Sequence, residues 1–229
     1  MKFLKYFKSL SRFETGLLLF SIVAVTLSFI LSPDKDILSL CASVIGVTAL
    51  IFIAKGMVIG QVLIVAFSVF YGIISFLFGY YGEMITYLCM SAPAAVFAII
   101  SWLRHPYEDG ECVKISKKLT VKSKIFLLLI TACLTVAFYF ILGALDTKNL
   151  LFSTLSVATS LLAAGLLFLR SPYYALGYAA NDVVLITLWV LATVQTPAYL
   201  PMIFCFAVFF VNDLYGFINW RRMKSAQVR

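Results

Sequence analysis

Charged residues are scarce in this chain of 229 residues. Asp, Glu, Lys and Arg together supply 12% of the sequence, whereas apolar residues supply 63%, and there is a single histidine. Soluble globular domains carry about twice that share of charge, so the scarcity excludes a soluble domain of this length. The mean hydropathy of +1.03 leads to the same conclusion. We therefore expect an integral membrane protein that uses lipid as part of its solvent.

Sequence signatures of metal, nucleotide and hydrolase chemistry are also missing. The five cysteines show no CxxC spacing, and the sequence contains no HExxH, GxSxG or Walker-type motif. The single histidine, His105, is expected to cap a helix end. We accordingly predict no catalytic residue, no metal site and no cofactor. Any transport is expected not to be driven by ATP hydrolysis within this chain.

Long apolar segments are present instead. They are roughly 16–22 residues long, enough for a helix to cross about 30 Å of hydrocarbon, and they lack the period-two alternation of a barrel strand. Segment 16–31 is interpreted as a retained helix rather than a cleaved signal peptide, because no small-residue cleavage pattern follows it. We predict an all-α bundle, a single transmembrane domain over residues 1–229. The eight expected spans are residues 16–31, 37–54, 58–78, 83–104, 125–143, 150–169, 173–194 and 199–220.

The basic residues are distributed very unevenly over the predicted loops. If the N-terminus is cytoplasmic, 16 of the 18 Lys and Arg residues lie on the cytoplasmic side, and only Lys35 and Lys148 lie outside. Cytoplasmic loops are enriched in basic residues, so we predict that both termini are cytoplasmic. The net charge of +8 then reflects topology and contact with anionic lipids, and no nucleic-acid partner is expected.

The two parts of the chain on either side of the polar stretch 105–124 resemble each other. Segment 38–55 aligns with 153–170, so that each ends in a basic residue, Lys55 or Arg170. We predict two parallel three-helix repeats, 37–104 and 150–220, joined by a linker helix at 125–143, with the helix at 16–31 added: a 1 + (3+1+3) bundle. Parallel repeats are typical of transporters whose site lies near the membrane midplane between the repeats.

Two carboxyl groups lie inside predicted spans. Asp182 falls near the middle of one helix and Asp213 in the inner half of the next, and each follows an asparagine. A charged group near the bilayer centre costs about 2.5–3.5 kcal/mol on insertion scales, so such residues are functional candidates. Aromatic, amide and hydroxyl side chains at helical spacing around them suit a flat heteroaromatic ring that carries a sugar. The predicted substrate-binding residues are Tyr178, Asn181, Asp182, Trp189, Asn212, Tyr71, Tyr87, Ser68, Asn219 and Tyr215.

Other interpretations of these residues stay open at this point. Asp182 and Asp213 fit a structural pair that shares a proton or bonds the neighbouring asparagines across the helix contact. Trp189 fits an ordinary tryptophan at the membrane interface. The remaining function classes are a membrane enzyme that uses Asp182 and Asp213 as acid and base, and a membrane partner or sensor protein that transports nothing.

Several segments resemble the Pnu family of bacterial vitamin transporters. In the first half they are Ala54-Lys55-Gly56, Tyr71, GYYGE at 79–83, Pro93 and Trp102; in the second half they are NDVV at 181–184, Trp189, NDLYG at 212–216 and Asn219-Trp220. The resemblance covers about residues 37–222. It implies a fold like that of the SWEET sugar transporters and a place in the bacterial plasma membrane.

The resemblance also implies a function. Members of this family take up nicotinamide riboside, thiamine, riboflavin or deoxynucleosides by facilitated diffusion, and cytoplasmic phosphorylation traps the substrate. We therefore expect uptake of a nicotinamide riboside-like vitamin or nucleoside. The expected partners are this small molecule, the lipid bilayer and a cytoplasmic kinase, and a homo-oligomer is left open.

The chain departs from the pattern of the nicotinamide riboside members at positions that bear on specificity. Those members carry a W-x-x-W pair early in the helix that holds Asp182, where this chain has Tyr178 and either Ala175 or Tyr174. Phe67 and Tyr87 stand where close relatives have asparagines. A pocket that loses amides and gains rings binds different edges of a ligand, so the substrate within the family is left open.

Overall fold

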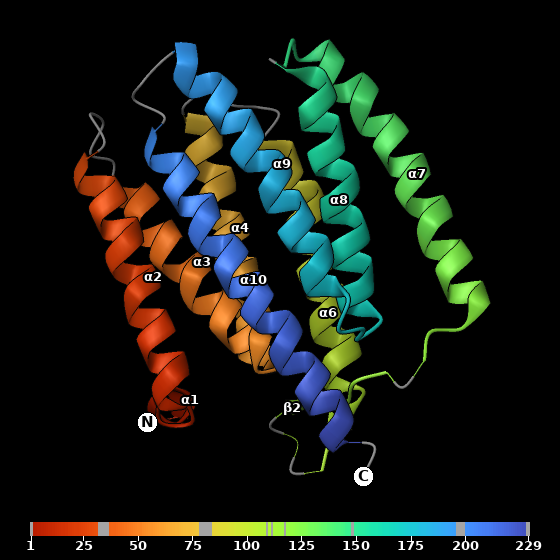
Figure 1. The fold of residues 1–229 in the computed structure, drawn as a ribbon. Helices are drawn as coiled ribbons and strands as arrows, with labels where there is room; N and C mark the ends of the chain where they lie inside the picture. Colours follow the sequence, from red (N-terminus) through yellow and green to blue (C-terminus); the bar gives the residue numbers. More distant parts are fainter. Residues whose placement is uncertain are drawn as a thin grey trace.

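The protein is a bundle of long helices aligned with one another, shown in Figure 1. The computed structural model describes residues 2–31, 37–77, 84–108, 110, 112–116, 118–147, 149–195 and 200–227. The elements are α1 (Lys2–Lys8), α2 (Arg12–Leu31), α3 (Ile37–Ala54), α4 (Val58–Leu77), the π-helix η1 (Thr86–Ser91), α6 (Ala92–Leu103), β1 (Pro106–Tyr107), β2 (Cys112–Val113), α7 (Val121–Ala144), α8 (Leu150–Phe168), α9 (Tyr174–Gln195) and α10 (Leu200–Ala226).

The predicted all-α fold is confirmed. Every predicted span coincides with a helix, and the limits agree to within about four residues except at α10, which continues beyond residue 220 to Ala226. The span expected at 83–104 is divided into η1 and α6. The short helix α1 was not predicted, and the whole GYYGE segment at 79–83 falls outside the described residues.

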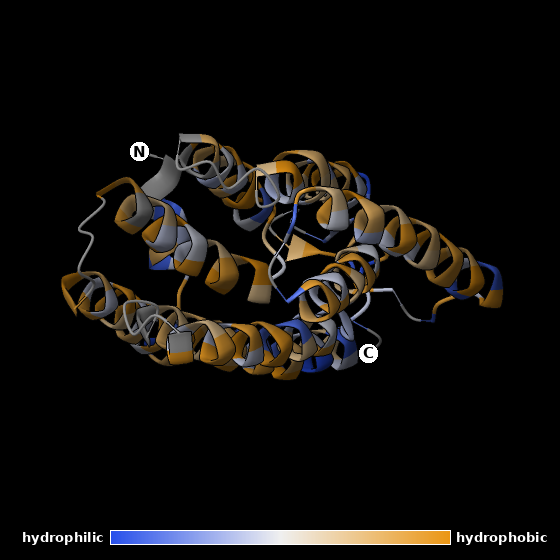
Figure 2. Ribbon diagram, turned by 90° about the horizontal axis from the view of Figure 1, so that it is seen from above, coloured by the Kyte–Doolittle hydropathy of each residue, from blue (hydrophilic) through white to orange (hydrophobic). Residues whose placement is uncertain are grey.

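Most of the helices are long and apolar enough to cross a membrane. Among the described residues, six segments meet this condition by length and composition: Arg12–Leu31, Thr86–Leu103, Val121–Ala144, Leu150–Phe168, Tyr174–Val194 and Met202–Ala226. Two shorter apolar stretches, Leu40–Ala54 and Val58–Ile73, lie within α3 and α4. Figure 2 looks along the bundle and shows that the helices are mostly hydrophobic.

Six helices close into a ring. Successive members pack together in the order α3, α4, α6, α8, α9 and α10, and α10 returns to contact α3. Two helices lie outside this ring: α2 packs against α3 and α10, and α7 packs against α8. We call α3, α4, η1 and α6 the first unit, and α8, α9 and α10 the second unit.

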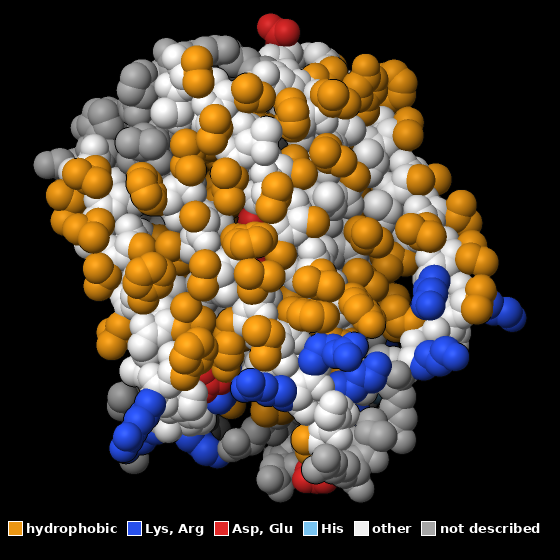
Figure 3. Space-filling model, viewed as in Figure 1, with side chains coloured by type: hydrophobic (Ala, Val, Ile, Leu, Met, Phe, Trp, Pro, Cys, Tyr) orange, Lys and Arg blue, Asp and Glu red, His pale blue; other side chains and the backbone are white. Residues whose placement is uncertain are grey.

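The surface of the bundle divides into an apolar band and a basic end. In Figure 3 hydrophobic side chains cover the middle of the visible face, and the Lys and Arg side chains gather below them. Both termini lie at this same end (Figure 1), which we call the basic end. Large apolar side chains such as Leu151 and Phe140 are 75% and 68% exposed, as expected for helices that face lipid.

Local sequence explains where two helices begin or change. Ser11 and Glu14 form a capping box at the start of α2: the Ser11 backbone N–H donates to Glu14 Oε2 at 2.6 Å, and the Glu14 N–H donates to Ser11 Oγ at 3.2 Å. Pro93 lies in the first turn of α6. Because proline lacks an N–H and clashes with the preceding turn, the wider π-helical turn η1 comes directly before it.

The turns that follow α3 and α8 have the same hydrogen bonds. After α3, the Gly56 N–H donates to Ile53 O and the Met57 N–H donates to Phe52 O, at 2.8 and 2.9 Å. After α8, Arg170 and Ser171 donate in the same way to Leu167 and Leu166, both at 2.9 Å.

The turn residues themselves are Gly56 and Arg170, which have φ angles of +69° and +55°. This is the Schellman-type helix end, in which a left-handed residue redirects the chain. The hydrogen bonds therefore make Arg170 equivalent to Gly56. The sequence alignment had paired Arg170 with Lys55, which is one residue earlier in the first unit.

A short hairpin joins the two units at the basic end. Strand β1 pairs with β2 in antiparallel register, with Tyr107 opposite Cys112. The segment after it reaches both turns: the Val113 N–H donates to Gly56 O at 2.9 Å, and the Ser116 N–H donates to Arg170 O at 3.0 Å. The polar stretch predicted as a divider is therefore bonded to equivalent positions of both units.

Candidate functional site

The interior face of α9 carries aromatic side chains. Val183 and Val190 are 51% and 43% exposed and mark the outward face of this helix. At about 100° per residue, Tyr178 and Trp189 lie on the opposite side, toward the interior of the ring. The predicted shared face of these two residues is therefore turned inward, where a substrate can be surrounded by helices.

The Asn181 side chain is held by the neighbouring helix of the same unit. Its Oδ1 atom accepts hydrogen bonds from Ser156 Oγ at 3.0 Å and from Thr159 Oγ1 at 2.9 Å, both on α8. The residue is 7% exposed. Since two hydroxyls hold the carbonyl oxygen, the amide is fixed in one orientation. The sequence singled out Asn181 but not its two supporting hydroxyls.

Asp182 and Asp213 meet between α9 and α10. They are 4% and 6% exposed, and their carboxyl groups lie within hydrogen-bonding range of each other. Within the described residues, no donor reaches the buried Asp182 Oδ2 atom. Two carboxyl groups in contact cannot both be ionised, so at least one of them carries a proton.

Asn212 connects the site region to α2. Its Nδ2 atom donates to Ser21 Oγ at 2.9 Å and to the Val208 carbonyl at 2.8 Å. The residue is 2% exposed, and its Oδ1 atom has no hydrogen-bond partner in the described part of the chain. The amide group is thus used to attach α2, and only the carbonyl oxygen is left to accept a further hydrogen bond.

An aromatic group lies across the ring, on α4 and η1. The ring centroids of Tyr71 and Tyr87 are 4.5 Å apart, and each lies 5.6 Å from the Phe67 ring. Ser68, next to Phe67, is fully buried, and its hydroxyl has no partner among the described residues. Phe67 is a participant that the sequence showed only as a substitution; the helical spacing from Phe67 to Tyr71 is the signal that pointed to it.

A layer of aromatic rings closes the basic end of the ring. The Trp102 and Trp220 rings are 5.5 Å apart, and Tyr174 lies 4.7 Å from Trp220 and 6.2 Å from Tyr178. The two tryptophans are 1% and 0% exposed. Both rings therefore pack inside the bundle and do not face lipid. We call these four residues the aromatic floor.

Each tryptophan of the aromatic floor is bonded to the other unit. Trp102 Nε1 on α6 donates to the Leu167 carbonyl of α8 at 3.3 Å, and Trp220 Nε1 on α10 donates to the Ile53 carbonyl of α3 at 2.9 Å. The residue before each tryptophan does the same. Ser101 Oγ donates to Phe168 O, and Asn219 Nδ2 donates to Ala54 O, both at 2.8 Å. The two units are therefore clamped together at this end by matching pairs of hydrogen bonds.

Two predicted site residues have other roles in the structure. Asn219 belongs to the clamp just described. The Tyr215 hydroxyl donates to Glu14 Oε1 at 2.8 Å, and Glu14 also forms an ion pair with Lys55 at 3.0 Å. Both side chains thus attach helices near the basic end, below the level of Asp182, and we do not retain them as substrate contacts.

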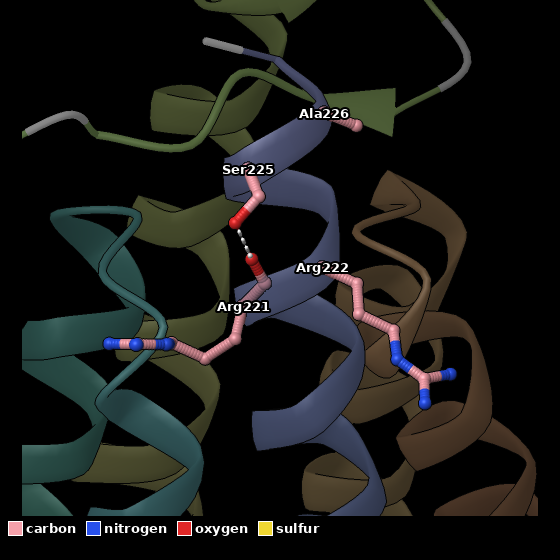
Figure 4. A pocket seen from close by; sticks show the side chains of 4 residues that line it. All are labelled: Arg221, Arg222, Ser225 and Ala226. Atoms are coloured by element: carbon pink, nitrogen blue, oxygen red, sulfur yellow. Dashed lines mark hydrogen bonds between the residues drawn. The ribbon is translucent and has the colours of Figure 1, made fainter. Parts of the chain in front are cut away.

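A separate hollow of about 450 Å³ lies at the end of α10 and is lined by Arg221, Arg222, Ser225 and Ala226. Figure 4 shows that its two arginine side chains point away from each other, while Ser225 Oγ donates to the Arg221 carbonyl at 3.1 Å. Guanidinium groups that diverge cannot hold one anion between them. The ring interior therefore remains the better candidate for the site.

Comparison with known proteins identifies relatives over nearly the whole chain. The nicotinamide riboside transporter PnuC of Neisseria mucosa is 25% identical over 218 residues, which cover 93% of this chain and 82% of that protein. PnuC of Haemophilus influenzae is 25% identical over 213 residues, which cover 92% and 90% of the two proteins.

A solved structure shows the same fold. The crystal structure of the vitamin B3 transporter PnuC matches with a TM-score of 0.78 at 23% identity, over 96% of this chain and 94% of that one. The sequence profile of the nicotinamide mononucleotide transporter family matches residues 36–222. This match confirms the resemblance to the Pnu transporters and the prediction of a transporter rather than an enzyme: the chain belongs to the nicotinamide mononucleotide transporter family.

Proposed function

We propose that this protein takes up nicotinamide riboside, or a vitamin or nucleoside built in the same way from a flat ring and a ribose, across the bacterial plasma membrane by facilitated diffusion. The observation that carries the proposal is the family match over residues 36–222. The two curated relatives, both named nicotinamide riboside transporters, support it because they align with more than nine-tenths of this chain.

The proposed topology has eight spans with both termini in the cytoplasm. Helices α3 and α4 are counted as spans because each is apolar and takes part in the same ring as the longer helices. Both termini lie at one end of the bundle, where the basic side chains gather (Figures 1 and 3). Because basic residues favour the cytoplasmic side, we assign the basic end to the cytoplasm.

The two units are proposed to be parallel repeats in a 1 + (3+1+3), SWEET-like arrangement, with α2 as the added helix and α7 as the linker. The matching turns at Gly56 and Arg170 support this proposal. The reciprocal bonds of Trp102 and Trp220 support it as well. Two repeats related by an axis along the membrane normal place a substrate site between them, near the midplane.

In the proposed site the ring of the substrate lies between aromatic side chains of the two units. Tyr71 and Tyr87 supply one wall, and Tyr178 and Trp189 supply the other, because the first pair are in ring contact and the second pair face inward from α9. The ribose hydroxyls are assigned to the polar residues of the second unit and to Ser68, whose buried hydroxyl has no partner among the described residues. The proposed contacts are Tyr71, Tyr87, Ser68, Tyr178, Trp189, Asn181, Asp182 and the Asn212 carbonyl.

Thiamine, riboflavin and a deoxynucleoside are the alternative substrates. The observation that favours them is the contact among Phe67, Tyr71 and Tyr87, which puts three rings on the wall where close relatives are expected to have asparagines. A wall of rings donates fewer hydrogen bonds to a carboxamide than a wall of amides does. Whichever compound is carried, we propose that a cytoplasmic kinase phosphorylates it. This keeps the cytoplasmic concentration of the free substrate low, so that its concentration gradient stays directed inward.

A thermal-shift measurement tests the proposal. Purified full-length protein in detergent is heated with nicotinamide riboside, thiamine, riboflavin or deoxyadenosine. A ligand at about 100 times its Kd stabilises the folded state by about 2.7 kcal/mol. Stabilisation by one compound, followed by its saturable flux into liposomes, identifies the substrate. If none of the four stabilises the protein and none is transported, the proposed function is wrong.

The variant Trp189→Ala tests the site itself. It removes one wall of the proposed ring-binding slot and is expected to abolish the thermal shift. Val190→Ala is the matched control, because Val190 is the next residue along α9 and faces outward. If Trp189→Ala keeps the full ligand-induced thermal shift, the substrate ring binds elsewhere in the protein.

A further inference from the structure

A second hollow lies outside the ring of helices, between α7 and α8 at the basic end. Its volume is about 440 Å³, within the range of roughly 300–1,000 Å³ that is typical of small-molecule sites. In Figure 1 the end of α7 at the basic end stands away from α8. Because α7 is not a member of the ring, this hollow is separate from the proposed substrate site in the ring interior.

Much of the wall of this hollow is apolar. Five leucines from α7, α8 and the segment before α7 line it: Leu119, Leu127, Leu128, Leu162 and Leu166. Leu128 is 59% exposed, so the apolar wall continues onto the surface of α7 that faces lipid. An acyl chain that starts in the hollow can therefore extend along α7 without leaving the hydrocarbon layer.

Three lysines from different parts of the chain line the same hollow. Lys118 precedes α7, Lys124 lies in the first turn of α7, and Lys224 lies near the end of α10. No Asp or Glu is among the described residues of the lining, and within the described ranges no carboxylate forms an ion pair with any of these lysines. Three positive charges around one hollow, without a neutralising carboxylate from that part of the protein, attract an anion.

The hollow lies where the apolar helices end. Helix α7 begins at Val121 and α8 ends at Phe168, close in sequence to residues that line the hollow on both sides. Tyr173 also lines it and is 48% exposed, and tyrosine is enriched at the level of the lipid headgroups. Figure 3 shows the basic side chains just below the apolar band. A phosphate in the hollow thus lies at the headgroup level, with leucines beside the chains attached to it.

We propose that this hollow binds one anionic phospholipid, with its phosphate among Lys118, Lys124 and Lys224 and its acyl chains against the leucines between α7 and α8. The apolar wall and its continuation onto the exposed face of α7 favour a lipid over a soluble anion. Basic pockets between membrane helices on the cytoplasmic side bind lipid headgroups. The bound lipid connects the linker helix α7 to the second unit across a gap between them.

A thermal-shift comparison of three probes tests this proposal. Purified full-length protein in an uncharged detergent is heated with dioleoyl phosphatidylglycerol, with dioleoyl phosphatidylcholine or with inorganic phosphate. Phosphatidylglycerol is expected to raise the midpoint of unfolding, because a ligand stabilises the state that binds it. Phosphatidylcholine has no net charge and inorganic phosphate has no acyl chain, so each is expected to give only a small part of this shift. No shift with phosphatidylglycerol, equal shifts with the two lipids, or a full shift with inorganic phosphate overturns the proposal.

The variant Lys118→Gln/Lys124→Gln/Lys224→Gln tests the position of the lipid. It removes the three charges and leaves the apolar wall intact. Each lysine near an anionic lipid surface strengthens binding by up to about fivefold. The Kd for phosphatidylglycerol is therefore expected to rise about tenfold or more in this variant, as measured by native mass spectrometry of the full-length protein.

The matched control is Lys8→Gln/Arg12→Gln/Lys122→Gln. It makes the same change in net charge, and its three residues are exposed and do not line the hollow. It is expected to keep the wild-type Kd to within about twofold. Equal weakening in the two triple variants would mean that lipid binds through the overall charge of the basic end, and the proposed site would be wrong.

A crosslinking measurement decides the matter if the first triple variant does not fold. Wild-type protein is irradiated with a phosphatidylglycerol that carries a diazirine in one acyl chain, and the labelled peptides are identified. Labels are expected within residues 118–128 and 162–166, which supply the leucines of the hollow. Labels confined to other segments overturn the proposal. None of these outcomes alters the proposed function, since the hollow lies outside the ring.

Discussion

The two units of the ring are alike at the basic end and different in the middle of the bundle. At the basic end their turns have the same backbone hydrogen bonds, and each contributes one buried tryptophan that bonds the other unit. Further along the helices the correspondence breaks down. Asn181 and Asp182 lie eleven and twelve residues after Arg170, where the first unit, counted from Gly56, has Phe67 and Ser68.

The same contrast holds on the last helix of each unit. Asn212 and Asp213 lie eight and seven residues before Trp220, and the first unit has Ala94 and Ala95 at these distances from Trp102. The geometry that the two units share at the basic end therefore supports the fold. The polar groups of the candidate site come almost entirely from the second unit. A ligand between the units meets rings on one side and amides and carboxyls on the other.

The largest effect is expected from breaking the feature that the units share. Trp102→Ala and Trp220→Ala each remove a fully buried indole, and each is expected to lower the free energy of unfolding by about 3–5 kcal/mol. Similar losses are expected because the two side chains have matching roles. Thermal unfolding in detergent measures both.

The matched controls for this pair are Trp102→Phe and Trp220→Phe. They keep a ring and lose the N–H donor, with an expected cost of about 1–3 kcal/mol each. A large loss in only one of the two alanine variants would show that the ends of the units are not equivalent.

A second prediction concerns the difference between the units. Tyr178 and Ile64 both lie eight residues after the left-handed turn residue of their unit, and both pack against the buried core at the basic end. Tyr178→Ala is expected to weaken substrate binding about tenfold or more, because stacking of a base on an aromatic ring is worth about 1–3 kcal/mol. Ile64→Ala is the matched truncation and is expected to reduce stability with little change in affinity. Calorimetric titration decides; equal losses of affinity in the two variants argue against a one-sided site.

The third prediction concerns α2, which attaches to one helix from each unit. Glu14 is 3% exposed, pairs with Lys55 after α3, and accepts a hydrogen bond from Tyr215 of α10. Glu14→Gln removes the charge at constant shape and is expected to destabilise the protein by about 1–3 kcal/mol. The exposed Lys8→Gln is the control, with an expected change below about 0.5 kcal/mol. Chemical unfolding measures the difference, and a neutral Glu14→Gln variant would mean that α2 is held by its apolar face alone.

The smallest effect is expected at the C-terminal end. Gln227 accepts a hydrogen bond from the Ile115 N–H at 2.7 Å and donates to the Val113 carbonyl at 3.1 Å. Gln227→Ala is expected to cost about 1 kcal/mol. Ser225→Ala serves as control because, in the described part of the chain, the Ser225 hydroxyl donates within its own helix, to the Arg221 carbonyl. The expected readout is faster proteolysis within residues 112–116 for Gln227→Ala alone; equal cleavage of both variants contradicts the role given to Gln227.

The helices could be predicted from the sequence because hydropathy and charge bias act on long segments. The span expected at 58–78 is α4 at Val58–Leu77, and the one at 173–194 is α9 at Tyr174–Gln195. Periodicity also placed Tyr178 and Trp189 on one face. These features depend only on helical geometry and the thickness of the bilayer.

The partners of the polar side chains could not be predicted in this way. Periodicity assigns a residue to a face of its helix but does not say which neighbour that face meets. Asn212 and Asn219 both appeared to line the cavity, yet one binds Ser21, far away in the sequence, and the other binds the Ala54 carbonyl. The π-helical turn before Pro93 also escaped prediction, because proline predicts an interruption without saying which form it takes.

The crossed bonds at the basic end have a consequence for how the chain is made. The Ile53 carbonyl accepts a hydrogen bond from the Trp220 side chain, and the Ile115 N–H donates a hydrogen bond to the Gln227 side chain. These contacts can form only after the last helix has been synthesised. The first unit must therefore enter the bilayer and remain with its inner surface incomplete until α10 has been inserted beside α3.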